Sequence, residues 1–450
     1  MANDFLKNSI GFLIPIKFQY SRTFWEQYKR ILDSEYWDHE KLRELQWKKL
    51  KDLLSYSYKH SKYYKRIFSE HGIIPNDIKD INDFQKKVPV LKKEDIRENL
   101  QDMICLPKNR IKKVTTGGST GIPLGFYLEK NITYQKTLAF EWRHYNEGGY
   151  QFRDRSVALR GKVIKNGVNK YDRYSNTLLL STYNMSQENM HEYVKLIEKF
   201  RPEYIKGYAS AVEVFAKFIA ENYPEFNNEQ YIKSLFTSSE TLYPHQLNLF
   251  KNHLKIKVYD KYGNSEQCSI IGQCRNSKYH DNMEYSFSEF LDQEDRPVSK
   301  GEAKLISTSF VNYAVPFIRY DTNDNVYVTL ENNCNCGRKS TIIKKILGRA
   351  QDIIVDNKNN LITLTSLIFA QHFDCFIRIK QLQIHQEKIG QISIRLIPTD
   401  NFTKKDKEEL INKIEKASNN RLSVFVEIVE KIDQTRSGKH LFLQQKLKLT

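Results

Sequence analysis

The sequence has no apolar run long enough to cross a membrane. The longest such run near its start, IGFLIPIKF from Ile10, is far shorter than the roughly 20 residues that a transmembrane helix needs. That segment also lacks the basic flank and the cleavage site of a signal peptide. The chain contains no internal repeat and no low-complexity segment. We therefore expect a globular protein that has no transmembrane segment and stays in the cytoplasm.

Cysteine is scarce, and its spacing does not suit a disulfide framework. Of the six cysteines, Cys105 and Cys375 stand alone, and the other four occur in two short groups. Small secreted domains that depend on disulfides carry a denser pattern. In a cytosolic protein, such groups indicate a metal site or free thiols.

Acidic residues are outnumbered, with 54 Asp and Glu against 71 Lys and Arg, so the formal net charge is +17. A basic chain can bind nucleic acid or an anionic membrane surface. Here the lysines are spread along the whole sequence instead of gathering in a tail or a stripe. We expect a solvated surface that attracts anionic substrates, with no nucleic-acid partner. Weak association with a membrane surface stays open, and the sequence indicates no oligomeric state.

The sequence does contain a regular alternation of strands and helices. A chain of 450 residues is too long for one core, so two or more domains are expected. Apolar periodicity predicts strands at 156–161, 204–208, 234–239 and 257–263, and helices at 187–200, 209–222 and 243–253. This alternation predicts an α/β domain with a largely parallel sheet.

Other elements flank this region. Helices are predicted at 40–71 and 91–100, and a β-rich part at 283–330. Beyond Gly348, the pattern predicts a strand at 391–398, a helix at 403–420 capped by Thr403, and a strand at 424–432. We therefore divide the chain into a large N-terminal domain, 1–347, and a small, mobile α+β domain, 348–450. The short connection between them would act as a hinge.

The stretch KKVTTGGSTGIPLGFY, residues 112–127, carries three glycines and four hydroxyls between Thr115 and Gly121. One interpretation is a tight turn after a strand, because glycine tolerates positive φ and Ser and Thr bond locally to the backbone. The other is a phosphate cradle built from clustered N–H and O–H donors. The loop is not a Walker A motif, since no Gly-Lys-Ser/Thr follows, and it is not G-x-G-x-x-G.

Four later motifs favour the second interpretation. They are YGNSEQ (262–267), PFIRYDTND (316–324), GRAQDIIV (348–355) and TRSGKH (435–440). Together with the loop TTGGSTGIP, this ordered set resembles the adenylate-forming (ANL) superfamily. It is most similar to the phenylacetate–CoA ligase-like group and its capsular-polysaccharide-biosynthesis (CapK-like) members. The resemblance runs from the helices near residue 45 to Lys439.

The resemblance implies a role for each motif. The loop would hold the β- and γ-phosphates of ATP through Thr116, Gly117, Gly118, Ser119, Thr120 and Gly121. Tyr262 would stack on adenine, although a core aromatic is an equal alternative for that residue alone. Glu266 would help to hold Mg²⁺, and Asp324 would accept hydrogen bonds from the ribose hydroxyls.

The implied catalytic groups are Thr120, Glu266 and a lysine. Lys439 would reach the α-phosphate and the substrate carboxylate from the C-terminal domain, where a point charge on a long stem suits the task. Its alternative is one surface lysine among many, and only the RSGK context distinguishes it. Arg349 would contact the ribose or the phosphates near the hinge.

The chain departs from the family pattern at three places. Leu124 stands where many members of the superfamily have a lysine, and Gln351 stands where an acidic residue or lysine is usual at the hinge. The stretch VDNKNNLITLTSL (355–367) lacks the glycine that is read as letting the pantetheine arm of CoA approach the backbone. This last departure disfavours CoA as the acceptor.

Four Cys and one His in CSIIGQCRNSKYH (268–280) and CNCGR (334–338) could form a zinc site. Spacing alone leaves zinc and free thiols equally open. Some phenylacetate–CoA ligase-like proteins carry a structural zinc on a Cys-x5-His pair and a later Cys-x-Cys pair. The resemblance therefore implies zinc on Cys274, His280, Cys334 and Cys336, with Cys268 as the spare.

The resemblance as a whole implies an AMP-forming ligase that uses ATP and Mg²⁺ to convert a carboxylic acid into an acyl-adenylate. The acyl group would then pass to an amine, an amino sugar or CoA, in the synthesis of a capsule or another surface polysaccharide. The relatives' acyl pocket falls around 142–145, 207–210 and 238–240. The alternatives are an aryl- or acyl-CoA synthetase of the phenylacetate–CoA ligase type and a catalytically silent nucleotide-binding assembly factor. A basic nucleic-acid-binding protein would not explain five ordered motifs.

Overall fold

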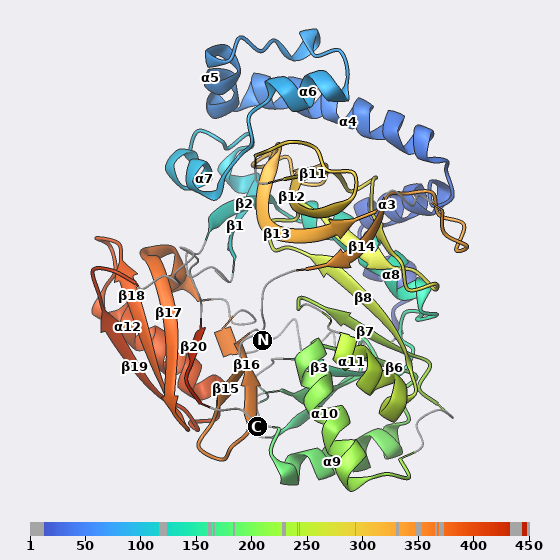
Figure 1. Ribbon diagram of the computed structural model, residues 1–450, viewed down its shortest axis with the longest axis vertical. Helices are drawn as coiled ribbons and strands as arrows, with labels where there is room; N and C mark the ends of the chain where they lie inside the picture. Colours follow the sequence, from blue (N-terminus) through green and yellow to red (C-terminus); the bar gives the residue numbers. More distant parts are fainter. Residues whose placement is uncertain are drawn as a thin grey trace.

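The computed structural model describes residues 13–116, 124–160, 164, 167–182, 185–226, 231–240, 242, 244–292, 294–329, 333–347, 353–364, 367–368, 373–432 and 443–447. Figure 1 shows a large body and, beside it, a smaller unit drawn in orange and red that is built on its own sheet. Within the described residues, no helix is both long enough and apolar enough to span a membrane.

The N-terminal region is helical, and helices α4 to α7 lie beyond β11–β13 at the top of Figure 1. Its elements are α2 (Ile16–Gln19), α3 (Arg22–Asp33), α4 (His39–His60), α5 (Lys62–Glu70), η2 (Pro75–Asp77), α6 (Ile81–Lys87), α7 (Lys93–Asn99) and η3 (Lys108–Arg110). The helix predicted at 40–71 is therefore two helices. They are separated at Ser61, whose hydroxyl accepts a hydrogen bond from the Tyr64 N–H and so caps the second helix.

The centre of the large body is one mixed sheet of twelve strands. Its spatial order is β11-β12-β13-β14-β10-β9-β8-β7-β6-β3-β5-β4. The first half of the sequence supplies β3 (Ser156–Arg160), β4 (Asn169–Asp172), β5 (Thr177–Ser181), β6 (Tyr204–Gly207), β7 (Ser234–Ser238) and β8 (Lys257–Gly263). Of these, β5, β3, β6, β7 and β8 run parallel to one another. The strands β3, β6, β7 and β8 were predicted, whereas β4 and β5 were not.

The rest of this sheet is antiparallel, so the expectation of a largely parallel sheet holds for only part of it. The strands beyond β8 are β9 (Ile270–Gln273), β10 (Tyr279–Asp281), β11 (Ser286–Leu291), β12 (Gly301–Ser309), β13 (Tyr320–Val328) and β14 (Ile342–Ile346). The predicted β-rich part thus continues the parallel sheet instead of forming a separate one. A separate hairpin is made by β1 (Ile111–Thr115) and β2 (Gly125–Glu129).

Helices cover both faces of the parallel strands. On one face, Val157 and Leu159 pack with α9 (Gln187–Phe200) and α10 (Ala209–Asn222). The elements α11 (Pro244–Leu249) and η4 (Phe250–Leu254) complete that layer. On the other face, Phe236 and Tyr259 share a core with Phe140 of α8 (Thr133–Glu147). This division follows from the strand period of two, which sends neighbouring side chains to opposite faces.

The C-terminal unit has its own four-stranded sheet, in the order β19-β18-β17-β20. Its elements are β15 (Ile353–Val355), β16 (Leu361–Thr363), η6 (Asp374–Arg378), β17 (Ile379–Lys388), β18 (Gln391–Pro398), α12 (Lys404–Ala417), β19 (Ser423–Ile428) and β20 (Leu443–Gln445). The predicted cap is confirmed: Thr403 and Asp406 form a capping box at the start of α12. The predicted boundary at residue 348 lies outside the described residues.

Candidate functional site

The neck of the Gly/Ser/Thr loop is held by its flanking strands. Thr115 pairs with Gly125 at the end of the β1–β2 hairpin. One residue further, the Thr116 N–H donates to the Leu124 carbonyl oxygen at 2.9 Å, and the Leu124 N–H donates to the Thr116 hydroxyl oxygen at 3.0 Å. The Thr116 hydroxyl therefore keeps its proton for a further partner. The loop residues Gly117, Gly118, Ser119, Thr120 and Gly121 lie outside the described residues.

Burial accounts for Leu124, one of the three departures from the expected family pattern. Its side chain is completely buried and shares a core with Phe317, Tyr320 and Cys268. A charged side chain there would lose its hydration without gaining a partner in this apolar cluster. The leucine thereby fixes the loop neck next to the strand that carries Tyr320.

Tyr262 and Asp324 meet although 62 residues separate them in sequence. The Tyr262 hydroxyl, at the end of β8, donates to Asp324 Oδ2 on β13 at 2.8 Å. The ring is partly buried against Ile271 and Leu305. Burial and the adjacent Asp324 charge raise the pKa of Tyr262 well above its usual range, so the hydroxyl stays protonated and remains a donor. The structure thus brings together two of the residues that the resemblance assigned to the nucleoside.

Glu266 is buried beside this pair. One of its oxygens accepts a hydrogen bond from the Tyr320 hydroxyl at 2.8 Å, and the same oxygen lies 3.9 Å from Lys93 Nζ. The Glu266 charge also contributes to the raised pKa of Tyr262, after burial and Asp324. A buried carboxylate with oxygen lone pairs suits a hard cation such as Mg²⁺. Tyr262, Glu266, Tyr320 and Asp324 therefore form one polar site.

Tyr320, a member of this site, and Lys93, a neighbour of Glu266, were not predicted. Tyr320 lies inside the motif PFIRYDTND, so its neighbourhood was identified but its contact with Glu266 was not. Lys93 is only 8% exposed, yet in sequence it is one lysine of a short amphipathic helix, α7. No local signal distinguishes it from a surface lysine, because its burial arises only from tertiary packing.

Two residues assigned by the resemblance, Arg349 and Lys439, have no described position. Arg349 falls in the stretch 348–352 and Lys439 in 433–442, which are both outside the described residues. Their roles remain predictions, and Gln351, a departure from the family pattern, lies in the first of these stretches.

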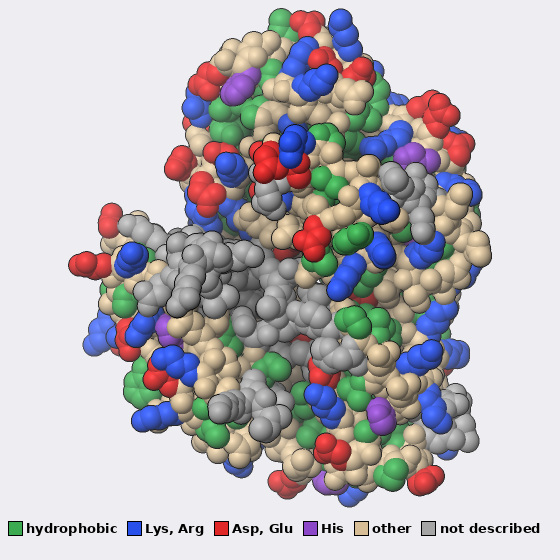
Figure 2. All heavy atoms as spheres, in the orientation of Figure 1, with side chains coloured by type: hydrophobic (Ala, Val, Ile, Leu, Met, Phe, Trp, Pro, Cys, Tyr) green, Lys and Arg blue, Asp and Glu red, His purple; other side chains and the backbone are tan. Residues whose placement is uncertain are grey.

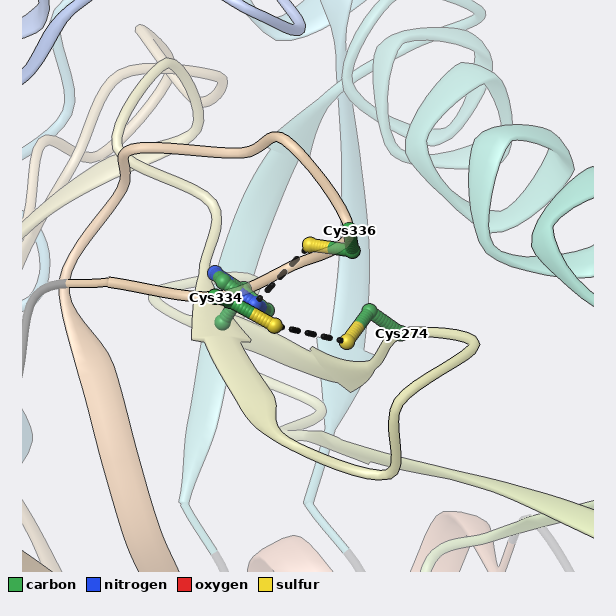
Figure 3. A group of neighbouring side chains, drawn as sticks. Cys274, Cys334 and Cys336 are labelled. Carbon is green, nitrogen blue, oxygen red and sulfur yellow. Dashed lines mark hydrogen bonds between the residues drawn. The ribbon is translucent and has the colours of Figure 1, made fainter.

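A second candidate site is a buried cluster of Cys274, His280, Cys334 and Cys336. Their ligand atoms all lie within 4.8 Å of one another. Figure 3 shows that the side chains of the three cysteines gather in the space between two loops. Cys274 comes from the β9–β10 turn, and Cys334 and Cys336 come from the 333–337 loop. The Cys274 and Cys334 sulfurs are 3.6 Å apart, and Cys336 Sγ lies 3.5 Å from His280 Nε2. In a tetrahedral zinc site with Zn–S bonds of about 2.3 Å, neighbouring sulfurs lie about 3.8 Å apart.

The surroundings of the cluster also suit a metal. The other ring nitrogen of His280, Nδ1, lies 3.2 Å from Ser340 Oγ, in the position from which a partner orients a metal-bound imidazole. Burial lowers the pKa of His280 to about 4, which leaves the ring neutral, as a ligand must be. Cys268 instead belongs to the apolar core around Tyr320. The predicted four-ligand set, with Cys268 as the spare, therefore fits zinc.

The segments assigned to the acyl pocket are only partly brought together. The end of β6 lies beside the end of β7, with Gly207 paired to Thr237. The Tyr145 ring of α8 packs 5.1 Å from Phe236 on the same side of the sheet. Arg143 turns elsewhere and forms a buried ion pair, at 2.6 Å, with a glutamate that precedes β11. Tyr145 and the strand ends therefore remain as candidates for this pocket.

Comparison with known proteins identifies relatives for both parts of the chain. Residues 354–446 match the family described as the CapK C-terminal domain. Protein CapK of Staphylococcus aureus is 26% identical over 450 residues, which cover 98% of this chain and 96% of that protein. The chain is a CapK-like relative of the adenylate-forming ligases. The phenylacetate–coenzyme A ligase of Thermus thermophilus is 26% identical over 341 residues, covering 70% of this chain and 72% of that one.

Solved structures agree on the architecture of this CapK-like chain. A crystal structure of 2-hydroxyisobutyryl-CoA ligase, in complex with 2-HIB-AMP and CoA in the thioesterification state, matches with a TM-score of 0.58. It covers 92% of this chain and 91% of that chain at 18% identity. The same ligase in the postadenylation state with 2-HIB-AMP gives a TM-score of 0.56. At this identity the likeness establishes the fold, which is that of the adenylate-forming CoA ligases.

Proposed function

We propose that this protein is an ATP-dependent ligase that activates a carboxylic acid as its acyl-adenylate and passes the acyl group to an acceptor. The observation that carries the proposal is the polar site of Tyr262, Glu266, Tyr320 and Asp324. These groups come from two ordered motifs and lie together in a fold shared with adenylate-forming ligases. The relatives named CapK and phenylacetate–coenzyme A ligase support the same class.

In the proposed reaction, a carboxylate oxygen of the substrate attacks the α-phosphorus of ATP. The bond between that phosphorus and the bridging oxygen to the β-phosphate breaks, and pyrophosphate leaves. Mg²⁺ would supply charge neutralisation for the phosphates, and Glu266 would hold it. Asp324 would orient the ribose, with Tyr262 fixing its carboxylate, and Lys439 would stabilise charge on the α-phosphate. The protein's contribution is mainly positioning and electrostatic stabilisation.

For the acceptor we propose an amine, such as an amino sugar of a capsule or another surface polysaccharide. The absence of glycine between Val355 and Leu367, which disfavours CoA, supports this choice. We propose a structural role for zinc at the Cys274–Cys336 cluster, because its four ligands leave no open position. We further propose that the C-terminal unit rotates about a hinge at 348–352 between the two half-reactions.

ATP–pyrophosphate exchange across a panel of carboxylic acids tests the proposal. We expect exchange that depends on Mg²⁺ and on one class of acid. The cognate acid is then offered with CoA or with an amino sugar in parallel, and AMP release is followed. A protein that binds ATP but supports no exchange with any acid is a binding factor and contradicts the proposal. Efficient thioester formation would contradict the choice of acceptor alone.

A further inference from the structure

The carboxyl ends of three parallel strands carry cations on the face that α8 covers. Arg160 ends β3, Lys206 lies near the end of β6, and Lys261 lies near the end of β8. The register aligns Lys206 with Phe236, a residue of the α8-side core. Arg160 and Lys261 lie two positions further along their strands than the residues in register with Lys206, so all three cations share its face. In open α/β sheets, ligands bind at this edge.

Contacts with α8 and with Tyr150, which follows it, fix two of these side chains. Lys261 Nζ forms an ion pair with Glu141 at 2.6 Å. Burial raises the pKa of Glu141, but the charge and hydrogen bond of Lys261, together with the charges of Arg160 and Lys206, outweigh burial and lower that pKa. Lys206 Nζ lies 3.4 Å from the centre of the Tyr150 ring and 4.9 Å from that of Tyr145. These cation–π contacts hold the ammonium in place but do not neutralise it.

Arg160 and Lys206 differ in their partners from two nearby lysines, Lys261 of β8 and Lys233, which directly precedes β7. Within the part of the chain that the structure describes, neither forms an ion pair, whereas Lys261 pairs with Glu141 and Lys233 pairs with Glu203. Arg160 is exposed, and part of the Lys206 side chain stays open to solvent. Two accessible cations side by side at a ligand-binding edge are poised to receive an anion.

In the unliganded protein, this arrangement destabilises the charged form of Lys206. Burial and the Arg160 charge lower the pKa of Lys206 well below its usual range. Asp154 and Glu141 act in the opposite direction, but they do not restore it. A bound anion would remove the repulsion between the two cations. A purely structural role would instead favour paired cations, as Lys233 and Lys261 show.

This cationic edge adjoins the proposed nucleotide site. Lys261 and Tyr262 are consecutive residues of β8, so their side chains leave the strand on opposite faces. Lys261 reaches Glu141 of α8, and Tyr262 reaches Asp324 of β13. A molecule that extends past the end of β8 could therefore contact the nucleotide on one side and the cations on the other.

We propose that Arg160 and Lys206 form an anion-binding subsite that selects an acid carrying a second negatively charged group. One carboxylate of such an acid is activated at the nucleotide, while its other anionic group binds these two side chains. The inference rests on the proposed function and names its substrate class. The second group is a carboxylate or a phosphate, since both accept hydrogen bonds from a guanidinium and an ammonium.

Pyrophosphate exchange by the full-length protein tests the choice of substrate. Succinate, glutarate and adipate are compared with butanoate, pentanoate and hexanoate, and phosphoglycolate serves as the phosphate-bearing acid. We expect activity with one of the dianionic acids. Arg160→Gln and Lys206→Gln should each raise KM for that acid by about ten- to a hundredfold, the usual effect of losing a charged hydrogen bond. Lys233 directly precedes the amino end of β7, away from the carboxyl ends that carry the cations. Lys233→Gln should therefore leave KM unchanged.

A labelling experiment tests the subsite without relying on catalysis. Because its pKa is lowered, the Lys206 amine should react readily with trinitrobenzenesulfonate at mildly alkaline pH. Peptide mass spectrometry should show that succinate, glutarate or phosphoglycolate slows this reaction and that butanoate does not. Arg160→Gln should abolish the protection.

The two experiments separate the possible failures. Equal exchange with monocarboxylic acids, unchanged in both variants, would overturn the subsite while leaving the proposed function intact. Protection of Lys206 without exchange by any acid would overturn the proposed function and leave the anion site standing. Protection by CoA alone, and by no acid, would assign the cations to the acceptor and overturn the inference.

Discussion

Replacing Glu266 with Gln separates the charge of this residue from its shape. The amide oxygen of Gln can still accept the hydrogen bond from the Tyr320 hydroxyl, now 2.8 Å from the carboxylate. Loss of the charge should weaken the hold on Mg²⁺ and lower the rate of pyrophosphate exchange by ~10²–10³-fold, the usual effect of one preorganised electrostatic group. Tyr320→Phe keeps the Glu266 charge and removes only its hydrogen-bond donor. Because that hydrogen bond is made to a charged group, its loss should cost about 1.5–3 kcal/mol, or roughly 10- to 150-fold in rate.

The same substitution also has a cost in stability, which has to be measured separately. Lys93 Nζ lies 3.9 Å from Glu266, and both side chains are nearly buried. Removing one partner of such a pair typically destabilises a protein by about 3–5 kcal/mol. We therefore expect a lower melting temperature for Glu266→Gln and normalise exchange to folded protein by circular dichroism.

Glu284→Gln is the matched control. It breaks another buried ion pair, with Arg143 at 2.6 Å, which shares no residue with the proposed nucleotide site. It should lower stability in the same way but leave exchange per folded molecule unchanged. If Glu266→Gln shows the same exchange rate and the same Mg²⁺ dependence as the unmodified protein, then Glu266 is not a metal ligand in this reaction.

Three further predictions concern zinc, the C-terminal lysine and the nucleoside. Protein purified without added zinc should contain about one zinc per chain, and Cys336→Ser should lower both the metal content and the melting temperature; freely titratable thiols and no metal would contradict the site. Lys439→Ala should reduce exchange by ~10²–10³-fold and leave the Kd for AMP within a factor of about three, because the other nucleotide contacts remain; full exchange would contradict its role. Tyr262→Phe keeps the ring but removes the donor to Asp324, so calorimetry should show the Kd for AMP rising by less than about tenfold; a much larger rise would mean that the hydroxyl itself binds the nucleotide.

Features with a local signal were predictable from the sequence. The cap at Thr403 is one, because Thr and Asp three residues apart satisfy each other's backbone donors regardless of the rest of the fold. The strands β3, β6, β7 and β8 are another, because each is a short segment set between helical or loop segments. The four ligands of the cysteine cluster were also identified, since their spacing survives in sequence even though 60 residues separate the two halves.

Features that depend on distant pairing could not be predicted. The apolar periodicity continues through Ser61, so only the hydrogen bonds of the folded chain reveal where α4 ends. The continuity of the large sheet depends on β10 pairing with β14, which follows it by about sixty residues. Lys93 beside Glu266 is a contact of the same kind. On the face shown in Figure 2, lysines and arginines are scattered among acidic side chains. Because the chain has so many surface cations, its composition could not show that Lys93 is buried.

The two faces of β8 restrict the length of the proposed substrate as well as its charge. The strand is held between β7 and β9, so the spacing between Tyr262 and Lys261, and hence between the nucleotide and the cationic edge, is fixed by the sheet. An acid bound at both ends must span that spacing, whereas an acid bound only at its reacting end need not. One methylene too few or too many should therefore change kcat/KM by about 10–200-fold. Exchange measured across the series from succinate to adipate should show one sharp optimum, which flattens in Arg160→Gln. A flat response in the unmodified protein would mean that the second anionic group of the acid is not held at this edge.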